Sequence, residues 1–511
     1  MIVPFVFDLF TGFPLVQSYH YNDFSKMTDK YNLPIIAKEA LADEQALLFR
    51  KDFQPQNVEE ICVKHFYTAA EESSSPLAKR YFIPKDFSKD IARKYGGYND
   101  AFVHLLTKRD ESFEAMLDAI VRDIINKYGK ITAFITVINY PSLQYIAQKY
   151  EIATLRFELG CFRAGYRKTA MLSEHPLYSN ENSSNMHKRY EMYLNETKFC
   201  GHKFITSKQI LSLFLLSNNL GYLDRYEDPP HYEIGCALGW SEDVRFTLDS
   251  QFNNQELLYS ANETFGIANV LARLHKSDPA QAQYTVLIQN EDSSPNPIEF
   301  ILKCKRIASV MSNVSIEAAF WGRSAYTFIK CPAYNMTLHD FDNKEQNIME
   351  DSYLNWYAFC WQSPLELIYD PDYLYWRLTK PSELEIYKRH LEYYLKQDNL
   401  EWDVINLEPM QSIEAIRSMR KPPPPLSPAA RPAPPPPPAS AAPPTSAAPP
   451  SSAAPPTSAA PPTPLATATP INPQEYLEGV STSLLIKKLL KRATPRFLWR
   501  ILAKSRRVML D

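Results

Sequence analysis

The chain has 511 residues, of which 45% are apolar, and its formal net charge is -3 at pH 7. This length is too great for one ordinary hydrophobic core, so two or three domains are expected, and the apolar fraction is high enough for most of the chain to fold. Seven scattered cysteines without close pairs exclude a disulfide scaffold and a zinc site, and indicate a reducing compartment. No run of 18 apolar residues is present to span a membrane.

The first elements in chain order alternate between strands and helices. The N-terminal run "MIVPFVFDLF" has no basic region and is interrupted by Asp8, so it is interpreted as a core strand and not as a signal peptide. A helix is predicted over 111–129, where apolar residues recur on one face. A strand over 131–138, a helix from Pro141 and a strand over 154–159 follow.

A second series of alternating elements begins near residue 232. Its predicted elements are a strand over 232–239, a helix over 254–266, strands over 269–275 and 284–289, a helix over 297–306, a strand over 307–311, a helix from Ser315 and a strand over 324–329. Residues 352–398 are predicted to be helical. Alternation of this kind is typical of parallel sheets covered by helices. The fold class is therefore α/β, with two Rossmann-like domains facing a cleft.

The predicted domains follow from these patterns. They are an N-terminal Rossmann-like acceptor-side domain (1–215), a second Rossmann-like domain (216–345), C-terminal helices (346–420), a Pro/Ala/Ser-rich disordered linker (421–473) and a basic tail (474–511). The linker repeats "SAAPPT" and proline runs, which cannot bury a core and favour an extended chain.

The tail is strongly basic while the rest of the chain is acidic. Residues 481–510 hold nine Lys or Arg and no acid, so nucleic acid is excluded as a partner of the acidic body. Leucines and isoleucines alternate with these cations at helical spacing, and Phe497 and Trp499 accompany them. Basic amphipathic helices of this kind bind anionic membrane surfaces. The alternative is a helix that docks on another protein.

Polar residues follow three strands of the second predicted domain. The segments are "ALGWSEDVRF" (237–246), "ARLHKSDP" (272–279) and "SVMSNVSIEAAFWG" (309–322). In an open α/β sheet ligands bind at the carboxyl ends of strands, and a helix start with small hydroxyl residues suits a phosphate. Each segment alone also has a structural interpretation, as a turn or a helix cap. Together they predict a nucleotide-phosphate pocket.

Several segments resemble bacterial capsule and O-antigen Kdo transferases. "FELGCFRAGY" (157–166) with "NENSS" (180–184) resembles their Glu-x-Gly-x-x-Arg and Asn-Ser elements, "RLHKSDP" their Arg-x-His-Pro strand end, and "MSNVSIEAAFWG" their Ser-rich Glu-Ala element. The order matches over 130–335. Lys276 and Ala164 stand where the family usually has proline. The nearest likeness is to retaining β-Kdo transferases that use CMP-Kdo, which implies a GT-B-like fold.

The resemblance implies roles for individual residues. Asp243 is expected to be the nucleophile of a double displacement, and Glu158 to be the general base or to orient one. The leaving phosphate is expected to be stabilised by His275, Lys276 or Ser277 and by the helix start near Ser312 and Ser315. The remaining substrate-binding residues are Arg163, which would pair with the Kdo carboxylate, together with Arg273, Lys276, Ser277, Ser312, Asn313, Ser315 and Glu317.

The expected function is transfer of Kdo from CMP-β-Kdo to an O-antigen or capsule acceptor, with retention and without a metal or other cofactor. The partners would be the CMP-sugar, a lipid-linked or polysaccharide acceptor and, through the tail, the anionic inner membrane. The enzyme would be cytoplasmic and peripheral on that membrane. Two alternatives stay open: a transferase for another CMP-nonulosonic acid such as sialic acid, and a catalytically silent, membrane-tethered scaffold of polysaccharide assembly.

Overall fold

The computed structural model describes residues 1–420 with gaps, and it does not describe 421–511. The gaps are 8, 10–13, 40, 42–78, 178, 199–201, 242, 245–247, 249–251, 276–277 and 344–346. The predicted linker (421–473) and basic tail (474–511) therefore lie outside the described residues.

The first sheet has seven strands in the order β12-β6-β5-β4-β1-β2-β3. Their bounds are β1 Ile2–Val6, β2 Ile35–Lys38, β3 Arg80–Ile83, β4 Ala133–Thr136, β5 Ala153–Leu159, β6 Thr169–Ser173 and β12 Gln362–Pro364. The five strands from β5 to β3 are parallel, whereas β6 and β12 are added in antiparallel pairs. The predicted N-terminal core strand is confirmed, since every residue of β1 is buried.

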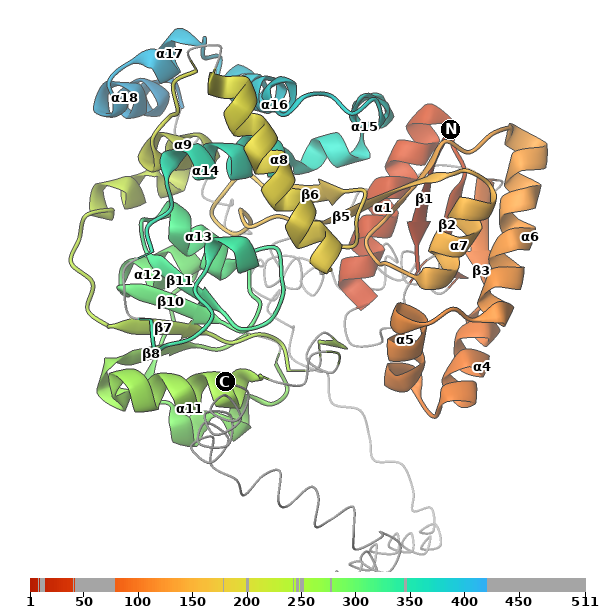
Figure 1. Cartoon of the computed structure of the whole chain (residues 1–511), viewed down its shortest axis with the longest axis horizontal. Helices are drawn as coiled ribbons and strands as arrows, with labels where there is room; N and C mark the ends of the chain where they lie inside the picture. Colours follow the sequence, from red (N-terminus) through yellow and green to blue (C-terminus); the bar gives the residue numbers. More distant parts are fainter. Residues whose placement is uncertain are drawn as a thin grey trace, which may run out of the picture. The chain divides into compact units, whose positions relative to one another are not determined.

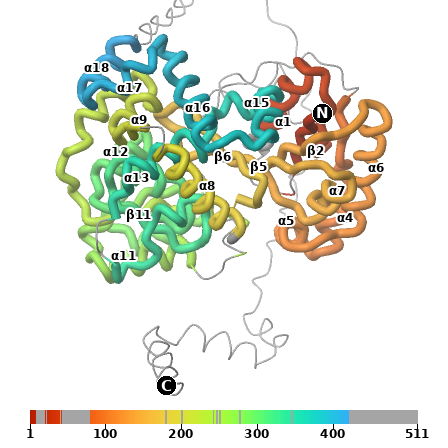
Figure 2. Tube along the Cα trace, turned by 45° about the horizontal axis from the view of Figure 1, so that its top comes forward, coloured from red at the N-terminus to blue at the C-terminus, as the bar shows by residue number. Residues whose placement is uncertain are grey.

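Helices cover both faces of the first sheet. One face packs against α4 (Lys85–Tyr95), α5 (Tyr98–Thr107), α6 (Glu111–Tyr128) and α7 (Pro141–Lys149). The other packs against α1 (Pro14–Tyr31) and α15 (Pro371–Leu378), which lie side by side (Figures 1 and 2). The helix α6 begins where the Asp110 side chain accepts from the Phe113 N–H (2.9 Å), and it ends at Gly129, whose φ is 89°.

The second sheet has five parallel strands in the order β11-β10-β7-β8-β9. Their bounds are β7 Ile234–Ala237, β8 Val270–Arg273, β9 Asn290–Glu291, β10 Arg306–Ser309 and β11 Ser324–Thr327, and the helices between them are α11 Asn254–Phe265, α12 Pro297–Leu302 and α13 Val314–Phe320. Together with the first sheet this confirms the predicted α/β class with two Rossmann-like units. A parallel sheet of this kind brings the carboxyl ends of its strands to one edge.

The predicted strand over 284–289 is wrong. Residues Thr285–Leu287 form a 3-10 turn, and the short strand β9 begins only at Asn290. The apolar run is not buried as a strand would be, because Tyr284 is 3% exposed whereas Val286 is 85% exposed. A hydrogen bond from the Thr285 hydroxyl to the Ala282 carbonyl (3.0 Å) stabilises the turn.

The remaining helices join one large hydrophobic cluster with the second sheet. They are α8 Asn180–Lys198, α9 Ser207–Phe214, α14 Asp351–Trp356, a π-helical turn Tyr357–Trp361, α16 Glu383–Gln397, α17 Asp403–Asn406 and α18 Pro409–Met419. The chain crosses between the sheets, since 161–223 contributes to this cluster and β12 pairs with the first sheet. Sequence periodicity did not predict β12. The domain boundaries at 215 and 345 stay a prediction.

Arg420, the last described residue, is tied to the folded part of the chain. Its Nε and Nη2 atoms contact Asp398 Oδ2 (3.0 and 2.8 Å), and Nη2 donates to the Leu213 carbonyl (2.7 Å).

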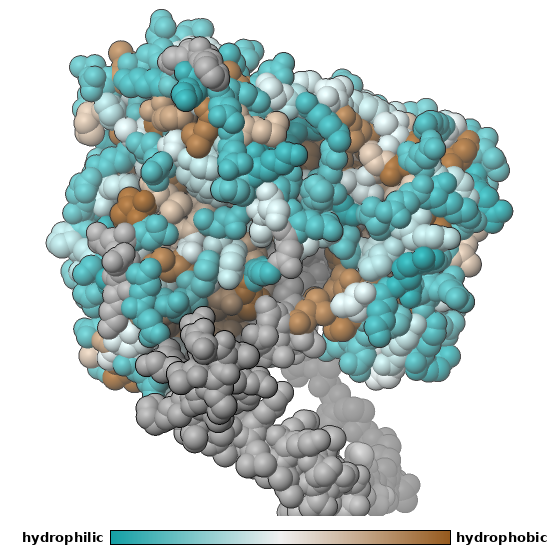
Figure 3. Space-filling model, viewed as in Figure 1, coloured by the Kyte–Doolittle hydropathy of each residue, from teal (hydrophilic) through white to brown (hydrophobic). Residues whose placement is uncertain are grey.

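Apolar side chains gather in the interior clusters, and the face in Figure 3 is mostly hydrophilic. Within the described ranges, no helix has both the length and the apolar character needed to cross a membrane.

Candidate active site

Three predicted polar segments lie at one edge of the second sheet. The strands β7, β8 and β10 are parallel neighbours, with Gly235 opposite both Leu271 and Ile307. The segments that follow these strands therefore emerge at the same, carboxyl edge. This is the edge at which open α/β sheets bind ligands.

The turn between β10 and α13 is closed by its own hydroxyl groups. The Ser312 N–H donates to Ser309 Oγ (2.9 Å), and Ser312 Oγ accepts from the Val314 N–H (3.3 Å). The Ser315 hydroxyl is buried, lies 2.8 Å from Ser309 Oγ and donates to the Tyr326 carbonyl (3.2 Å). The hydroxyl of Ser315 thus binds the sheet, while Ser312 stays half-buried in the turn.

Asn313 links this turn to the end of β5 in the first sheet. Its Nδ2 atom donates to the carbonyls of Leu159 (3.2 Å) and Gly160 (3.4 Å). Arg163 donates to the same two carbonyls, from Nη2 to Leu159 (2.9 Å) and from Nε to Gly160 (2.8 Å). The predicted residues Asn313 and Arg163 are therefore brought together on one pair of backbone oxygens.

Gly160 is required at this junction because its neighbours leave no room for a side chain. A Cβ atom there would lie 2.1 Å from Thr169 Oγ1, 2.2 Å from Gln362 Oε1 and 2.9 Å from the Thr169 carbonyl carbon. The close approach lets β5 end against β6 and β12. It thereby fixes the end of β5, which carries Glu158, and the turn after it, which carries Arg163.

Glu158 and Arg163 are neighbours at the surface of this turn. Glu158 Oε1 lies 4.0 Å from Arg163 Nη2 and accepts from the Leu159 N–H (3.1 Å). The Arg163 side chain is 41% exposed, and its Nη1 atom has no hydrogen-bond partner among the described residues. The guanidinium is therefore held by two of its nitrogens and can still bind an anion through the third.

Glu317 is a buried carboxyl group that faces this region. It lies in the first turn of α13, is 3% exposed, and its Oε2 atom has no hydrogen-bond partner among the described residues. Burial raises the pKa of Glu317 to about 8, and the charges of Arg163 and Arg273 oppose that rise. Glu317, Arg163 and Arg273 therefore share one electrostatic environment.

The guanidinium of Arg273 is already bound within the second sheet. Its Nη1 atom contacts the Asp292 carboxylate and donates to the Ser294 carbonyl (3.0 Å). Lys303 Nζ binds the other oxygen of Asp292 (3.0 Å), and the Asp292 side chain is 0% exposed. Burial would raise the pKa of Asp292, but Ser294, Lys303 and Arg273 hold it below its usual value.

Asp243 and His275 lie in the segments that follow β7 and β8. The Asp243 N–H donates to the Trp240 carbonyl (3.0 Å), its side chain is partly exposed, and the next residue, Val244, packs against the core of the first sheet. His275 is exposed, and its carbonyl accepts from the Asp278 N–H (3.0 Å). Lys276 and Ser277 lie outside the described residues.

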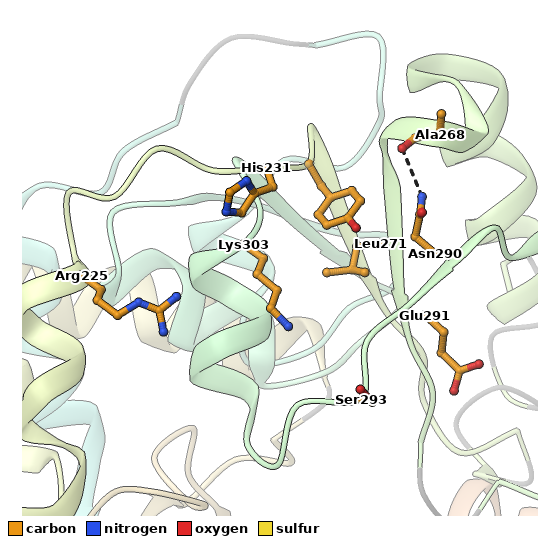
Figure 4. A pocket seen from close by; sticks show the side chains of 9 residues that line it. Arg225, His231, Ala268, Leu271, Asn290, Glu291, Ser293 and Lys303 are labelled. Carbon is orange, nitrogen blue, oxygen red and sulfur yellow. Dashed lines mark hydrogen bonds between the residues drawn. The ribbon is translucent and has the colours of Figure 1, made fainter.

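A hollow of about 570 Å³ lies at the opposite, amino edge of the second sheet. Arg225, His231 and Lys303 line one part of it, and Glu291 lines another (Figure 4). Lys303 is bound to Asp292, and Arg225 contacts carboxylates of Asp228 (3.3 Å) and Glu299 (3.9 Å). Both permanent cations of this hollow therefore already face carboxylates.

Three residues of the candidate site, one at the end of β5 and two at the carboxyl edge of the second sheet, were not predicted as functional. Gly160 and Asp278 stand inside the quoted segments 157–166 and 272–279, and Asn254 begins α11. Asn254 accepts from the Gly239 N–H (3.0 Å) and donates to the Gly239 carbonyl (2.8 Å). An Asn at a helix start suggests only a cap, so its contact with the segment after β7 had no sequence signal.

Comparison with known protein families gives one match, which covers part of the chain. Residues 66–177 match the Glycosyltransferase 99 family N-terminal domain. This part of the chain carries Glu158 and Arg163. A comparison with curated proteins finds no match. The match, together with the two α/β sheets, supports a glycosyltransferase.

Solved structures that match parts of this chain include two β-Kdo transferases of KpsC from Thermosulfurimonas dismutans. The 2,7 transferase is 15% identical over 51% of this chain and 89% of that chain (TM-score 0.30), and the 2,4 transferase is 13% identical over 45% and 80% (TM-score 0.29). A glycosyltransferase from Rickettsia africae is 12% identical over 77% and 97% (TM-score 0.26).

Proposed function

We propose that this chain transfers Kdo from CMP-β-Kdo to an O-antigen or capsule acceptor. The observation that supports this most is the junction at Leu159 and Gly160. There Arg163 of the first sheet and Asn313 of the second bind the same carbonyls, while Glu317 lies within the influence of Arg163. A donor with one carboxylate and one phosphate suits such a junction, because both of its anionic groups need donors.

The donor would be held from both sheets. The outward nitrogen of Arg163 would bind the sugar carboxylate, since arginine forms strong charge-assisted hydrogen bonds with carboxylates. Ser312 and Asn313 would lie along the phosphate, and Glu317 would contact the nucleoside. Arg273 would act through its positive charge, because its guanidinium is engaged with Asp292.

The reaction would proceed with retention by two displacements. The Asp243 carboxylate attacks the anomeric carbon, the bond to the phosphate oxygen breaks, and CMP leaves while His275 stabilises its charge. Glu158 then takes the proton of an acceptor hydroxyl, whose oxygen attacks the same carbon and releases Asp243. Two inversions restore the starting configuration.

The substrate is tested by CMP release from a panel of CMP-sugars in the presence of acceptor. We expect CMP-Kdo to be turned over, and Arg163→Gln to raise its KM by roughly 10- to 100-fold, because a charged hydrogen bond contributes about 1.5–3 kcal/mol. Arg163→Lys should recover part of this loss. Arg225→Gln, which removes an exposed arginine at the opposite edge, is the matched control and should leave KM unchanged.

The panel also decides between the alternatives. Faster turnover of CMP-sialic acid than of CMP-Kdo would show that the donor sugar is sialic acid and not Kdo. If no CMP is released from any CMP-sugar, the catalytically silent scaffold is favoured. Activity should persist in EDTA. No three His, Cys, Asp or Glu side chains in the described part of the chain are grouped to hold a metal ion, and metal independence stays a prediction.

The basic tail would hold the enzyme on the inner face of the bacterial cytoplasmic membrane. We expect the full chain to sediment with vesicles that contain phosphatidylglycerol and not with pure phosphatidylcholine, with binding weakened by salt. A chain ending at Arg420 keeps the contacts of that residue with Asp398 and Leu213, so it should fold, stay in the supernatant and act on a soluble acceptor. If the full chain does not sediment with anionic vesicles, the tail docks on another protein instead.

A further inference from the structure

Asp278 connects the two segments that carry Asp243 and His275. It is 5% exposed, and its Oδ1 atom accepts from the Ser241 N–H (3.2 Å), the Ser241 hydroxyl and the Ala280 N–H (3.2 Å). Its own N–H donates to the His275 carbonyl (3.0 Å). One residue is therefore bonded to the segment after β7 and to the segment after β8.

The segment after β7 makes further hydrogen bonds on either side of Ser241, at Gly239 and between Trp240 and Asp243. Asn254, which is 2% exposed, binds both the N–H and the carbonyl of Gly239. The turn from Trp240 to Asp243 is closed by the backbone hydrogen bond between these residues (3.0 Å). Gly239 is thus bound to α11 through Asn254, and Ser241 to the segment after β8 through Asp278.

We propose that Asp278 is a positioning residue that keeps the carboxylate of Asp243 and the imidazole of His275 in one arrangement at the carboxyl edge. This rests on the proposed function, in which both side chains act on the same bond to phosphate. Without Asp278, Ser241 loses its acceptor for a backbone N–H and a hydroxyl. The segment after β7 would then keep its Asn254 contact but lose the two hydrogen bonds from Ser241 to the segment after β8.

The role differs from that of a substrate contact. A positioning residue should affect the rate of the bound complex more than the affinity for the donor, because misplacing a reacting group by about 1 Å can lower the rate 100-fold. We therefore expect Asp278→Ala to lower kcat by roughly 100-fold while KM for CMP-Kdo changes by less than about 3-fold. Asp278→Asn retains an acceptor oxygen for Ser241 and should recover most of kcat.

Two comparisons separate positioning from a general loss of stability. Asp398→Asn alters a buried aspartate that binds Arg167 and Arg420 away from these segments, so it should lower the melting temperature without changing kcat of the folded enzyme. Ser241→Ala in the Asp278→Ala background should add little, because both changes remove the same contact. An unchanged kcat in Asp278→Ala overturns the proposal.

A measurement that needs no activity distinguishes this proposal from the function on which it rests. Hydrogen–deuterium exchange should be faster in the segments after both β7 and β8 in Asp278→Ala, and unchanged in α6. If the wild-type chain released no CMP from any donor, the proposed function would fail, and this exchange would still decide whether Asp278 joins the segments. Exchange at the wild-type rate in both segments overturns the positioning role.

Discussion

Asp243→Asn is expected to leave the fold and CMP binding intact while transfer falls by roughly 10⁴-fold, the scale seen when an essential group of a catalytic set is removed. The amide is nearly the same shape as the carboxylate but is too weak a nucleophile to form the adduct. Its backbone hydrogen bond to Trp240 does not involve the side chain and should survive. Turnover of CMP-Kdo and titration with CMP measure the two properties separately.

The contrary outcome is equally specific. If Asp243 only shapes a turn, asparagine replaces it with little loss, since both residues suit turns, and turnover stays near the wild-type value. With the wild-type enzyme, intact-mass measurement after rapid acid quench should reveal a protein heavier by one Kdo unit. An adduct that persists in Asp243→Asn would assign the nucleophile to another residue.

Glu383→Ala is expected to give the largest loss of stability, about 3–5 kcal/mol in the free energy of unfolding. The carboxylate of Glu383 binds Arg189 through two hydrogen bonds (2.6 and 3.1 Å) and accepts from Trp356 Nε1 (3.1 Å), so it joins α8, α14 and α16. The side chains of Arg189 and Glu383 are 13% and 5% exposed. Burial would lower the pKa of Arg189, but the Glu383 carboxylate raises it. Removal of Glu383 therefore leaves a buried cation without its counter-charge.

Urea unfolding measures this loss, and two variants test its cause. Lys89→Ala removes an ion pair with Asp86 whose side chains are 60% and 84% exposed, and it should leave stability unchanged. Replacing both Arg189 and Glu383 by apolar residues of similar size should restore much of the loss, because no charge is then left unpaired. A single Glu383→Ala variant as stable as the wild type would show that the pair contributes nothing.

The sequence predicted the elements whose local signals agree with their burial. In α6 the helical spacing, the Asp110 cap and Gly129 all indicate the same bounds. The run at 284–289 has strand-like residues, but Val286 is exposed, so composition alone was misleading there. The strand β12 depends on pairing with β6, nearly two hundred residues earlier, and no local pattern in "QSP" reports such a partner.

The candidate site was predictable to the level of the sheet edge. Polar residues that follow parallel strands converge there, and Ser312, Asn313 and Glu317 lie at the carboxyl edge of the second sheet, while their roles stay a prediction. The partner of each side chain was not predictable. Arg273 was predicted only as a substrate-binding residue. Its contact with Asp292, which lies beyond the 284–289 run, depends on how the intervening turn folds.

The junction at Leu159 and Gly160 determines which positions of the chain are free to vary during evolution. Its acceptors are main-chain carbonyls, so any side chain at 159 that packs acceptably presents the same oxygen to Asn313 and Arg163. Chemical identity is demanded only at the donors and at Gly160, where a Cβ has no space. We therefore expect substitutions around this link between the two sheets to be tolerated better than substitutions at Gly160, Arg163 and Asn313.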